Sequence, residues 1–162
     1  MADANTHYYG SEQQWRVELS FLNTVGTLSS STSSVLFDKF AGGDTTAPAN
    51  KHRPGGMATE VTYLSLPSYS DVTLTKAYNT QVDHDLIGLL HNAVGRIMCK
   101  VVMNPLDDSG ANFGATRTYT GRLVSVKDGG TDSMSGATRM WEVDISVETV
   151  SDSGTTGSAG IY

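Results

Sequence analysis

The sequence predicts a mainly β protein, a small β-barrel or two-sheet sandwich of about six or seven strands with one flanking α-helix at about 81-94. Charged residues make up only 17% of the chain, while Gly, Ser and Thr are abundant, a composition typical of strands joined by flexible turns. Several segments alternate apolar and polar residues with the period of a strand, and only one has the period of a helix. A length of 162 residues suits a single domain with one core.

The domain is predicted to span 14-150, beginning with its clearest amphipathic strand. Residues 1-13 are polar, and we expect them to form a flexible N-terminal arm. Strict alternation over 14-22 predicts a half-buried strand. Its apolar face consists of Trp15, Val17, Leu19 and Phe21. A Ser/Thr/Gly linker over 23-34 then leads into a short apolar run at 35-37 that continues to residue 40.

The polar segment over 41-57 is predicted to be a long loop, with two Gly-Gly pairs and two of the four prolines. Compact domains rarely contain such a loop unless it has a function or is disordered. Its basic residues form the densest cationic group of an acidic chain. Two interpretations stay open, a solvated loop and a contact loop that becomes ordered against another subunit. The candidate inter-subunit or inter-ring contact residues are Phe37, Phe40, Lys51, His52 and Arg53.

Two short strands, over 57-66 and 71-77, are predicted before the helix. Thr80 stands at the N-cap position of that helix, and Gly95 follows its last apolar residue as a C′ glycine. One apolar stripe has the helical period, formed by Val82, Leu86, Leu89, Leu90, Ala93 and Val94. The opposite, exposed face carries His84, Gly88 and His91. Gly in mid-helix costs about 1 kcal/mol relative to Ala, so we expect another group to approach closely at Gly88.

Three further strands follow the helix. The segment over 96-103 is apolar, and we expect its single cysteine, Cys99, to be buried and unreactive. In the strand over 116-127 the apolar parity changes at Gly121, which predicts a β-bulge. The strand over 140-150 places Glu142, Asp144 and Glu148 on its solvent face. Residues 151-162 are Ser/Gly-rich and are expected to form a flexible C-terminal tail.

Catalytic signatures are absent from the sequence. It contains no Walker loop, nucleophile elbow, His-Glu-x-x-His, Cys-x-x-Cys or dinucleotide fingerprint. His84 and His91 lie about two helical turns apart, too far to share one metal ion. The oxygen-rich segment 107-112 lacks the spacing of an EF-hand loop and predicts a turn. We therefore expect no enzyme activity, no catalytic residues, no cofactor and no metal.

The charge and the hydropathy pattern limit the partners. A formal net charge of −6 argues against tight DNA binding, because proteins that hold phosphates normally carry a basic excess. This net negative charge is compatible with a surface past which DNA slides. No run of about 18 apolar residues is present, and the start lacks the basic and apolar regions of a signal peptide. We expect no membrane association and folding in a cytoplasm.

Two stretches of the chain resemble bacteriophage tail tube proteins. The strand over 71-78 (DVTLTKAY) that leads into the helix through Asp83, His84 and Leu86 resembles the strand-to-helix junction of that family. The segments 100-107 (KVVMNPLD) and 117-126 (RTYTGRLVSV), with a Gly/Asn turn between them, are similar to a hairpin of the major tail protein of long-tailed phages. Tyr-Thr-Gly-x-Leu is the most specific part. The likeness covers about residues 57-150, and the helix lacks the tryptophan usual in contractile-tail relatives, which favours a non-contractile tail.

The resemblance implies a structural protein that closes into hexameric rings, which stack into a tube and conduct double-stranded DNA during ejection without binding it tightly. Its implied partners are other copies of itself, a tape-measure protein, and the tail initiator and terminator proteins. The implied location is the virion tail, assembled in the host cytoplasm. On this interpretation Glu142, Asp144 and Glu148 are candidate lumen-facing residues, although the same face could point outward.

Two other functions stay open. A tube subunit of a contractile injection or secretion system would have the same fold and pass proteins instead of DNA. A β-sandwich adhesin or carbohydrate-binding module would show exposed aromatic residues as a sugar platform, whereas Trp15 and Trp141 are both predicted on the apolar faces of their strands.

Overall fold

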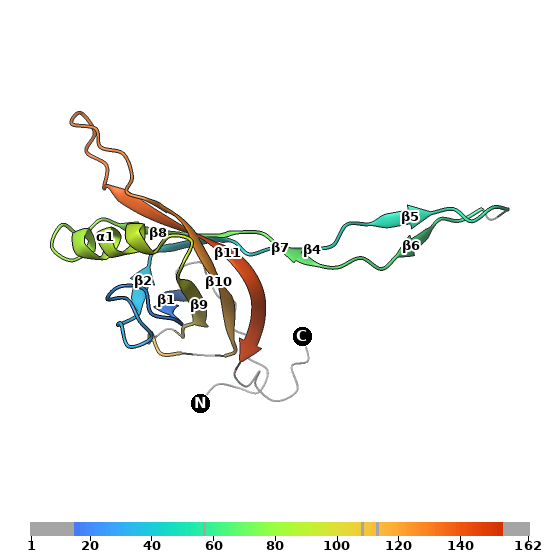
Figure 1. The fold of residues 1–162 in the computed structure, drawn as a ribbon, viewed down its shortest axis with the longest axis horizontal. Helices are drawn as coiled ribbons and strands as arrows, with labels where there is room; N and C mark the ends of the chain where they lie inside the picture. Colours follow the sequence, from blue (N-terminus) through green and yellow to red (C-terminus); the bar gives the residue numbers. More distant parts are fainter. Residues whose placement is uncertain (1–14, 57, 108, 113, 154–162) are drawn as a thin grey trace.

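The computed structural model describes residues 15–56, 58–107, 109–112 and 114–153; the segments predicted as a flexible arm, 1-13, and most of the predicted tail, 154–162, lie outside them. The fold is mainly β with one helix, and its largest sheet is a nearly closed antiparallel barrel, as predicted (Figure 1). The elements in chain order are β1 (Trp15–Phe21), β2 (Val35–Phe37), β3 (Lys39–Gly42), β4 (Thr45–Thr46), β5 (Asn50–His52), β6 (Val61–Tyr63), β7 (Ser68–Tyr69), β8 (Val72–Ala77), α1 (Asp83–Ala93), β9 (Met98–Pro105), β10 (Thr116–Lys127) and β11 (Met140–Ser153).

The barrel is closed by a single bent strand. Its seven strands follow the order β2-β1-β9-β10-β11-β8-β3, so the two outermost strands are consecutive in the chain and separated only by Asp38. The N–H of Asp38 donates to the carbonyl of Thr75 (3.0 Å), and its carboxylate accepts from the N–H of Ala77 (2.9 Å). Residues 35–42 thus pair with β1 first and with β8 next. Little free edge remains for unintended pairing with other chains.

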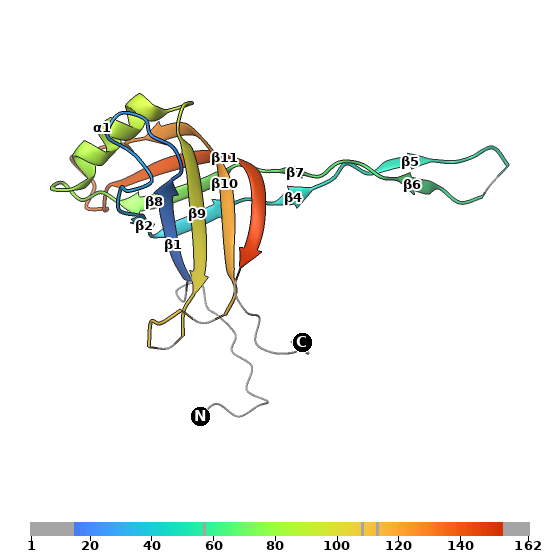
Figure 2. The ribbon, with the colours of Figure 1, turned by 60° about the horizontal axis from the view of Figure 1, so that its bottom comes forward.

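The core fills the barrel, and α1 lies across one end of it (Figure 2). Trp141 is the largest fully buried side chain and packs on Phe37 with ring centroids 5.3 Å apart. Trp15 was predicted to share the buried face of β1, but it is 40% exposed because it stands at the end of the strand, beyond the packed interior. Cys99 is fully buried, as predicted, and burial raises the pKa of its thiol to about 12.

The predicted apolar stripe of the helix is confirmed for Leu90 and Ala93, which are buried, and for Leu86, Leu89 and Val94, which pack against the core. It is wrong at the start of the helix. Its buried residues are Asp83, Ile87, Leu90 and Ala93, whereas Val82 is 63% exposed. Thr80 is not the N-cap: the cap position is Val82, which makes no side-chain capping bond. The turn before the helix is held instead by Asn79, whose Oδ1 accepts from the N–H of Gln81 (3.0 Å). The helix ends as predicted, with Gly95 at a φ of +79°.

Asp83 explains why the buried face at the start of the helix differs from the prediction. Its carboxylate is fully buried and accepts from Lys76 Nζ (2.9 Å), the N–H of Asn79 (2.7 Å) and Trp141 Nε1 (3.3 Å). Burial alone would raise the pKa of Asp83, but the hydrogen bond and charge of Lys76, with the N–H groups of Asn79 and Trp141, outweigh it and hold the pKa below its usual value. The hydrogen bonds from Lys76 and Trp141 to this carboxylate orient the first turn of the helix toward β8 and β11.

Gly121 forms the predicted bulge. The register between β10 and β11 shifts between Thr120 and Gly121, which leaves Glu148 between the partners of these two residues. A Cβ at Gly121 would lie 1.9 Å from the carbonyl oxygen of Ser146, so only glycine fits. β11 continues to Ser153, three residues past the predicted end of its strand.

The segment predicted as a loop over 41-57 is one limb of a long two-stranded arm (Figures 1 and 2). The other limb contains the predicted strand over 57-66, of which only Val61–Tyr63 has strand structure. The limbs pair through β4 with β7 and through β5 with β6. About 13 residues from Gly43 to Gly55, at a rise of about 3.3 Å each, give the arm a reach of about 40 Å.

Candidate assembly surfaces

The arm exposes apolar side chains along its second limb. The exposed fractions are 41% for Val61, 55% for Tyr63, 102% for Leu64 and 88% for Leu66. A lone two-stranded hairpin is at best marginally stable in water. These features make the arm a candidate surface for contact with another molecule.

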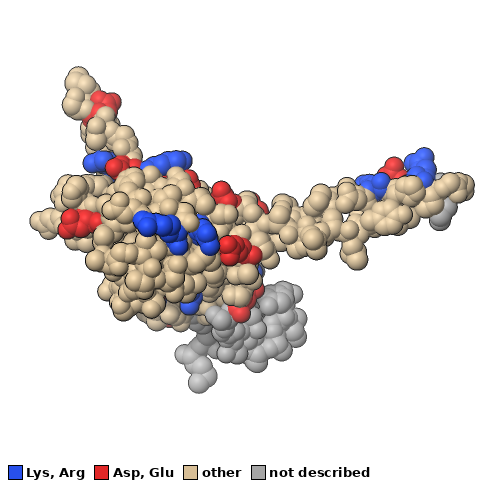
Figure 3. Space-filling model, in the orientation of Figure 1, with Lys and Arg blue, Asp and Glu red and all other residues tan. Residues whose placement is uncertain are grey.

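The basic residues predicted for a contact loop lie on the exposed part of this arm. Lys51 and His52 belong to β5, and Arg53 follows it. His52 packs on Tyr63 across the arm, and Arg53 lies 3.8 Å from the carboxylate of Glu60. Cationic and acidic side chains are visible toward the arm's tip (Figure 3).

Phe37 and Phe40, predicted in the same contact group, lie on barrel strands and not on the arm. Phe37 is 6% exposed and packs inside the barrel against Trp141, so it is not available to a neighbouring subunit. Phe40 is half-buried on β3, with its ring 5.2 Å from that of Tyr119. The short apolar run that contains Phe37 is a barrel strand because it pairs with β1 rather than leading into the arm.

The acidic side chains of β11, Glu142, Asp144 and Glu148, lie on the outer surface of the barrel. Two of them pair with a lysine. Lys127 Nζ lies 3.1 Å from Glu142 and 3.5 Å from Asp144, and these carboxylates raise the pKa of Lys127. Thr73 donates a hydrogen bond to Asp144 (2.8 Å). Glu148, at the bulge, is exposed.

The strands beside these acidic side chains add positive charge. Lys100 on β9 and Arg122 on β10 alternate with the buried Cys99 and Leu123, so they share the outer surface. The wall formed by β9, β10 and β11 therefore intersperses cations with its carboxylates, and Figure 3 shows both signs mixed on the barrel. Sequence reasoning considered one strand alone and missed these cations, because their proximity depends on strand register.

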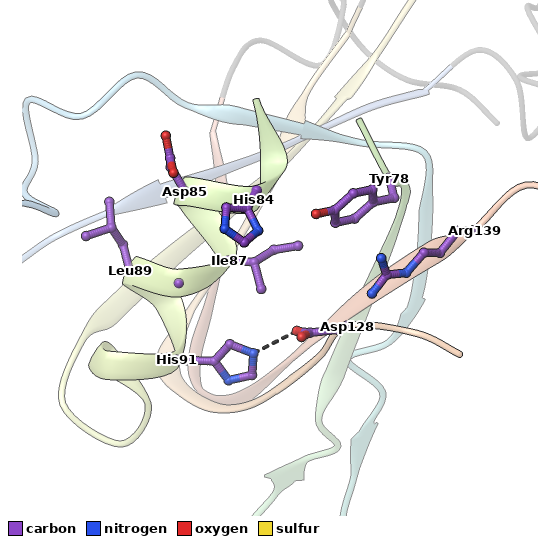
Figure 4. A pocket seen from close by; sticks show the side chains of 9 residues that line it. Tyr78, His84, Asp85, Ile87, Leu89, His91, Asp128 and Arg139 are labelled. Carbon is purple, nitrogen blue, oxygen red and sulfur yellow. Dashed lines mark hydrogen bonds and ion pairs between the residues drawn. The ribbon is translucent and has the colours of Figure 1, made fainter. Parts of the chain in front are cut away.

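The helix residues predicted to be exposed are exposed. His84, Gly88 and His91 form one wall of a cleft of about 720 Å³, and the loop between β10 and β11 forms another (Figure 4). His91 Nε2 lies 2.7 Å from Asp128 Oδ1 across the cleft. No described atom lies within 4 Å of a Cβ built on Gly88, so no group of this chain's described part explains the glycine.

One charged group of this cleft, Arg139, lies against an aromatic ring. The guanidinium of Arg139 stacks 4.4 Å above the ring of Tyr78.

Across the described ranges, no group of three or more His, Cys, Asp or Glu side chains could hold a metal ion. Asp107, in the oxygen-rich turn, uses its carboxylate to accept from the N–H groups of Ser109 and Ala111 (both 2.9 Å).

A second, apolar cavity was not predicted. It has a volume of about 450 Å³, and its larger lining side chains come from four strands: Trp15 of β1, Phe40 of β3, Met103 of β9 and Tyr119 of β10. Arg117 and Asp152, paired at 2.7 Å, also line it. No local sequence signal marks this site, because the four strands meet only in the folded barrel.

Of the helices described, none has the length and hydropathy needed to cross a membrane.

Comparisons with known proteins support the fold. No protein family and no curated protein matches the sequence. A chain of the anti-feeding prophage baseplate, 6-fold symmetrised, matches with a TM-score of 0.73 and 14% identity over 92% of this chain and 98% of that one. A chain of the sheath-tube complex of an extracellular contractile injection system (PVC) in its extended state gives 0.72 and 12% over 91% and 93%. A chain of the anti-feeding prophage cap, described as tube-terminating, gives 0.72 and 13% over 95% and 97%. At these identities the likeness concerns the fold, which this chain shares with the matched chains over nearly its whole length.

Proposed function

We propose that this chain is a structural subunit that assembles with copies of itself into rings, and that the rings stack into a tube, as in the tail tube of a long-tailed phage. The arm is the observation that carries this proposal. A closed barrel needs no partner strand, yet this one extends an arm of about 40 Å with four exposed apolar side chains. Such an element is stable when another molecule covers it.

The arm is also compatible with a ring or tube. A contact between the arm of one copy and the barrel of the next joins two different surfaces. When the second copy does not place its own arm on the first, the contact is head-to-tail and repeats until it closes into a ring or continues as a filament. We propose six copies per ring, in keeping with the 6-fold symmetry of the baseplate whose chain shares this fold.

The outer wall of β9, β10 and β11 is the proposed lumen surface, with Glu142, Asp144 and Glu148 facing the channel. Because cations and carboxylates alternate there, the wall has no basic excess to hold phosphates, and each copy adds a formal charge of −6. Double-stranded DNA would therefore pass without tight binding. A tape-measure protein and the tail initiator and terminator are the further partners of this proposal, and the virion tail is the location.

Negative-stain electron microscopy of the purified chain over a range of concentrations tests the proposal. The expected result is rings or tubes with a central channel. A protein that stays monomeric at every concentration, and also when a tail initiator complex is added, would contradict it.

A tube subunit of a contractile injection system is the second candidate. It is favoured by the matched chains, two of which come from a prophage assembly and one from a contractile injection system. The content of the channel distinguishes the two candidates. Particles isolated from producing cells would hold DNA during ejection in the first case and protein cargo in the second.

A further inference from the structure

We propose that Leu64 and Leu66 of the arm insert into the apolar cavity lined by Trp15, Phe40, Met103 and Tyr119 on a second copy of the chain. This inference rests on the proposed self-assembly and names the two surfaces that make the contact.

The arm presents the two leucines together. They lie between the two paired parts of the arm, where the ladder of β5 and β6 has ended and that of β4 and β7 has not begun. The hydroxyl of Ser65 donates to the carbonyl of Pro48 on the opposite limb. Because side chains alternate along an extended strand, the residues flanking Ser65 both point away from that limb. Exposures of 102% for Leu64 and 88% for Leu66 agree with this geometry.

The cavity is suited to apolar side chains. Its volume of about 450 Å³ lies in the range of sites that hold small ligands. Trp15 is 40% exposed at its mouth, although tryptophan is usually among the more buried residues. Filling the cavity would cover this indole, and the paired Arg117 and Asp152 would form a polar rim around the contact.

The helix-side cleft is a poorer receptor. Its lining includes Asp85, His91, Asp128 and Arg139, and an inserted leucine would take these four polar or charged groups out of water. The apolar cavity has two charged lining residues, Arg117 and Asp152, and these pair with each other at 2.7 Å.

A second copy fits better than the chain's own arm. Both views show the arm pointing away from the barrel (Figures 1 and 2). A barrel of about 110 residues has a radius of gyration of about 13 Å, so an arm of about 40 Å extends well beyond it. The part of the arm from Asn50 to Tyr63 carries Lys51 and Arg53 against Glu60, so it is net cationic on a chain of formal charge −6. This asymmetry attracts the arm to another copy.

Covalent trapping tests the contact in the full chain. The double variant Leu64→Cys with Met103→Cys is assembled and treated with a short bis-maleimide. The native Cys99 is fully buried and its pKa is raised to about 12, so it does not compete for the reagent. The control is Leu64→Cys with Met134→Cys, because Met134 is 92% exposed on a loop outside the cavity.

The expected result is a ladder of covalent multimers on a denaturing gel, at about tenfold or higher yield than in the control. Tubes visible by electron microscopy without this ladder would overturn the contact and leave the tube proposal standing. A cross-linked product that migrates as a monomer would show the arm folded onto its own barrel, and would also overturn it. Neither tubes nor links at any concentration would overturn both proposals.

A second variant avoids dependence on the cross-linker. Leu64→Ser with Leu66→Ser should raise the concentration needed for polymerisation, followed by light scattering, about tenfold or more. The unfolding midpoint should not change, since both side chains are exposed in the monomer. Met134→Ser is the matched control and should leave polymerisation unchanged. Polymerisation of the double serine variant at the wild-type concentration would contradict the inference.

Discussion

At the residue scale, one carboxylate determines how the helix sits on the barrel. Asp83 connects α1 to β8 through Lys76 and to β11 through Trp141, and its lone pairs are satisfied by three donors. A buried carboxylate without these donors would be strongly unfavourable. The helix therefore follows its polar contacts as well as its apolar residues.

Asp83→Asn should lower the free energy of unfolding by about 2 to 3 kcal/mol at pH 7, because it removes the ion pair and leaves Lys76 beside a neutral group. The folded-state pKa of Asp83 lies below its ordinary 3.8, so its contribution is present above about pH 4 and is lost as the pH falls through the folded-state value. Urea denaturation between pH 7 and pH 3 measures both effects. Asp85→Asn, which changes an exposed carboxylate of the same turn, should cost less than about 1 kcal/mol. Equal losses for the two variants would refute the role given to Asp83.

Two glycine substitutions should act in opposite directions. Gly121→Ala should destabilise the protein by about 2 to 4 kcal/mol, because its Cβ would overlap the backbone of β11 at Ser146. Gly88→Ala, on the open face of α1, should stabilise it by about 0.5 to 1 kcal/mol through helix propensity. Thermal unfolding of both variants checks the pair. A neutral Gly121→Ala would show that the bulge can relax.

At the element scale, the barrel and the arm have separate tasks. Every buried core residue of the described ranges lies in a barrel strand, in the helix, in the loop after β1 or, for Ile97, between α1 and β9. The arm's apolar residues between 61 and 66 are exposed. Folding and the proposed association therefore depend on different side chains.

Shortening the arm should weaken assembly and leave the fold of the barrel intact. β4 and β7 pair through Thr46 and Ser68, so residues 47–67 can be replaced by Asn-Gly, which favours a two-residue hairpin turn. The unfolding free energy should change by less than about 1 kcal/mol, while polymerisation should need at least about tenfold more protein. Chemical denaturation and light scattering measure the two quantities. A shortened chain that still forms tubes would assign assembly to another surface.

The sequence predicted features that depend on neighbours along the chain. Alternation in β1 and β11, the Gly95 terminus, the Gly121 bulge and the burial of Cys99 are all local patterns, and the structure confirms them. The arm was missed because its limbs pair with each other and carry little alternation. The burial of Asp83 was missed because the apolar period cannot show that this carboxylate meets Lys76 and Trp141 in three dimensions.

The same limit applied to the candidate sites. The exposure of His84, Gly88 and His91 follows from helical period. The pairing of Lys127 with Glu142 and Asp144 requires strand register, and the cavity between Trp15 and Tyr119 requires the closed barrel. Neither is encoded over a short stretch of sequence.

At the scale of the whole molecule, the proposed channel wall allows a direct test of charge. Glu148→Lys is the cleanest reversal, because Glu142 and Asp144 share Lys127 and their replacement would disturb that cluster. At physiological salt, charges act over about 8 Å, so only residues near passing DNA change its motion. We expect tubes of normal appearance and slower DNA ejection from assembled tails. Unchanged ejection kinetics would place Glu148 away from the lumen.

The arm is also an insertion between two strands that lie beside each other, since β3 and β8 pair directly. For a flexible connection, the entropy lost on closing a loop grows only with the logarithm of its length, and each doubling costs about 0.6 kcal/mol. The distance that a subunit spans can therefore lengthen or shorten over evolutionary time while the barrel keeps the same interior. A tube built from such subunits can change its spacing between neighbours without a new fold.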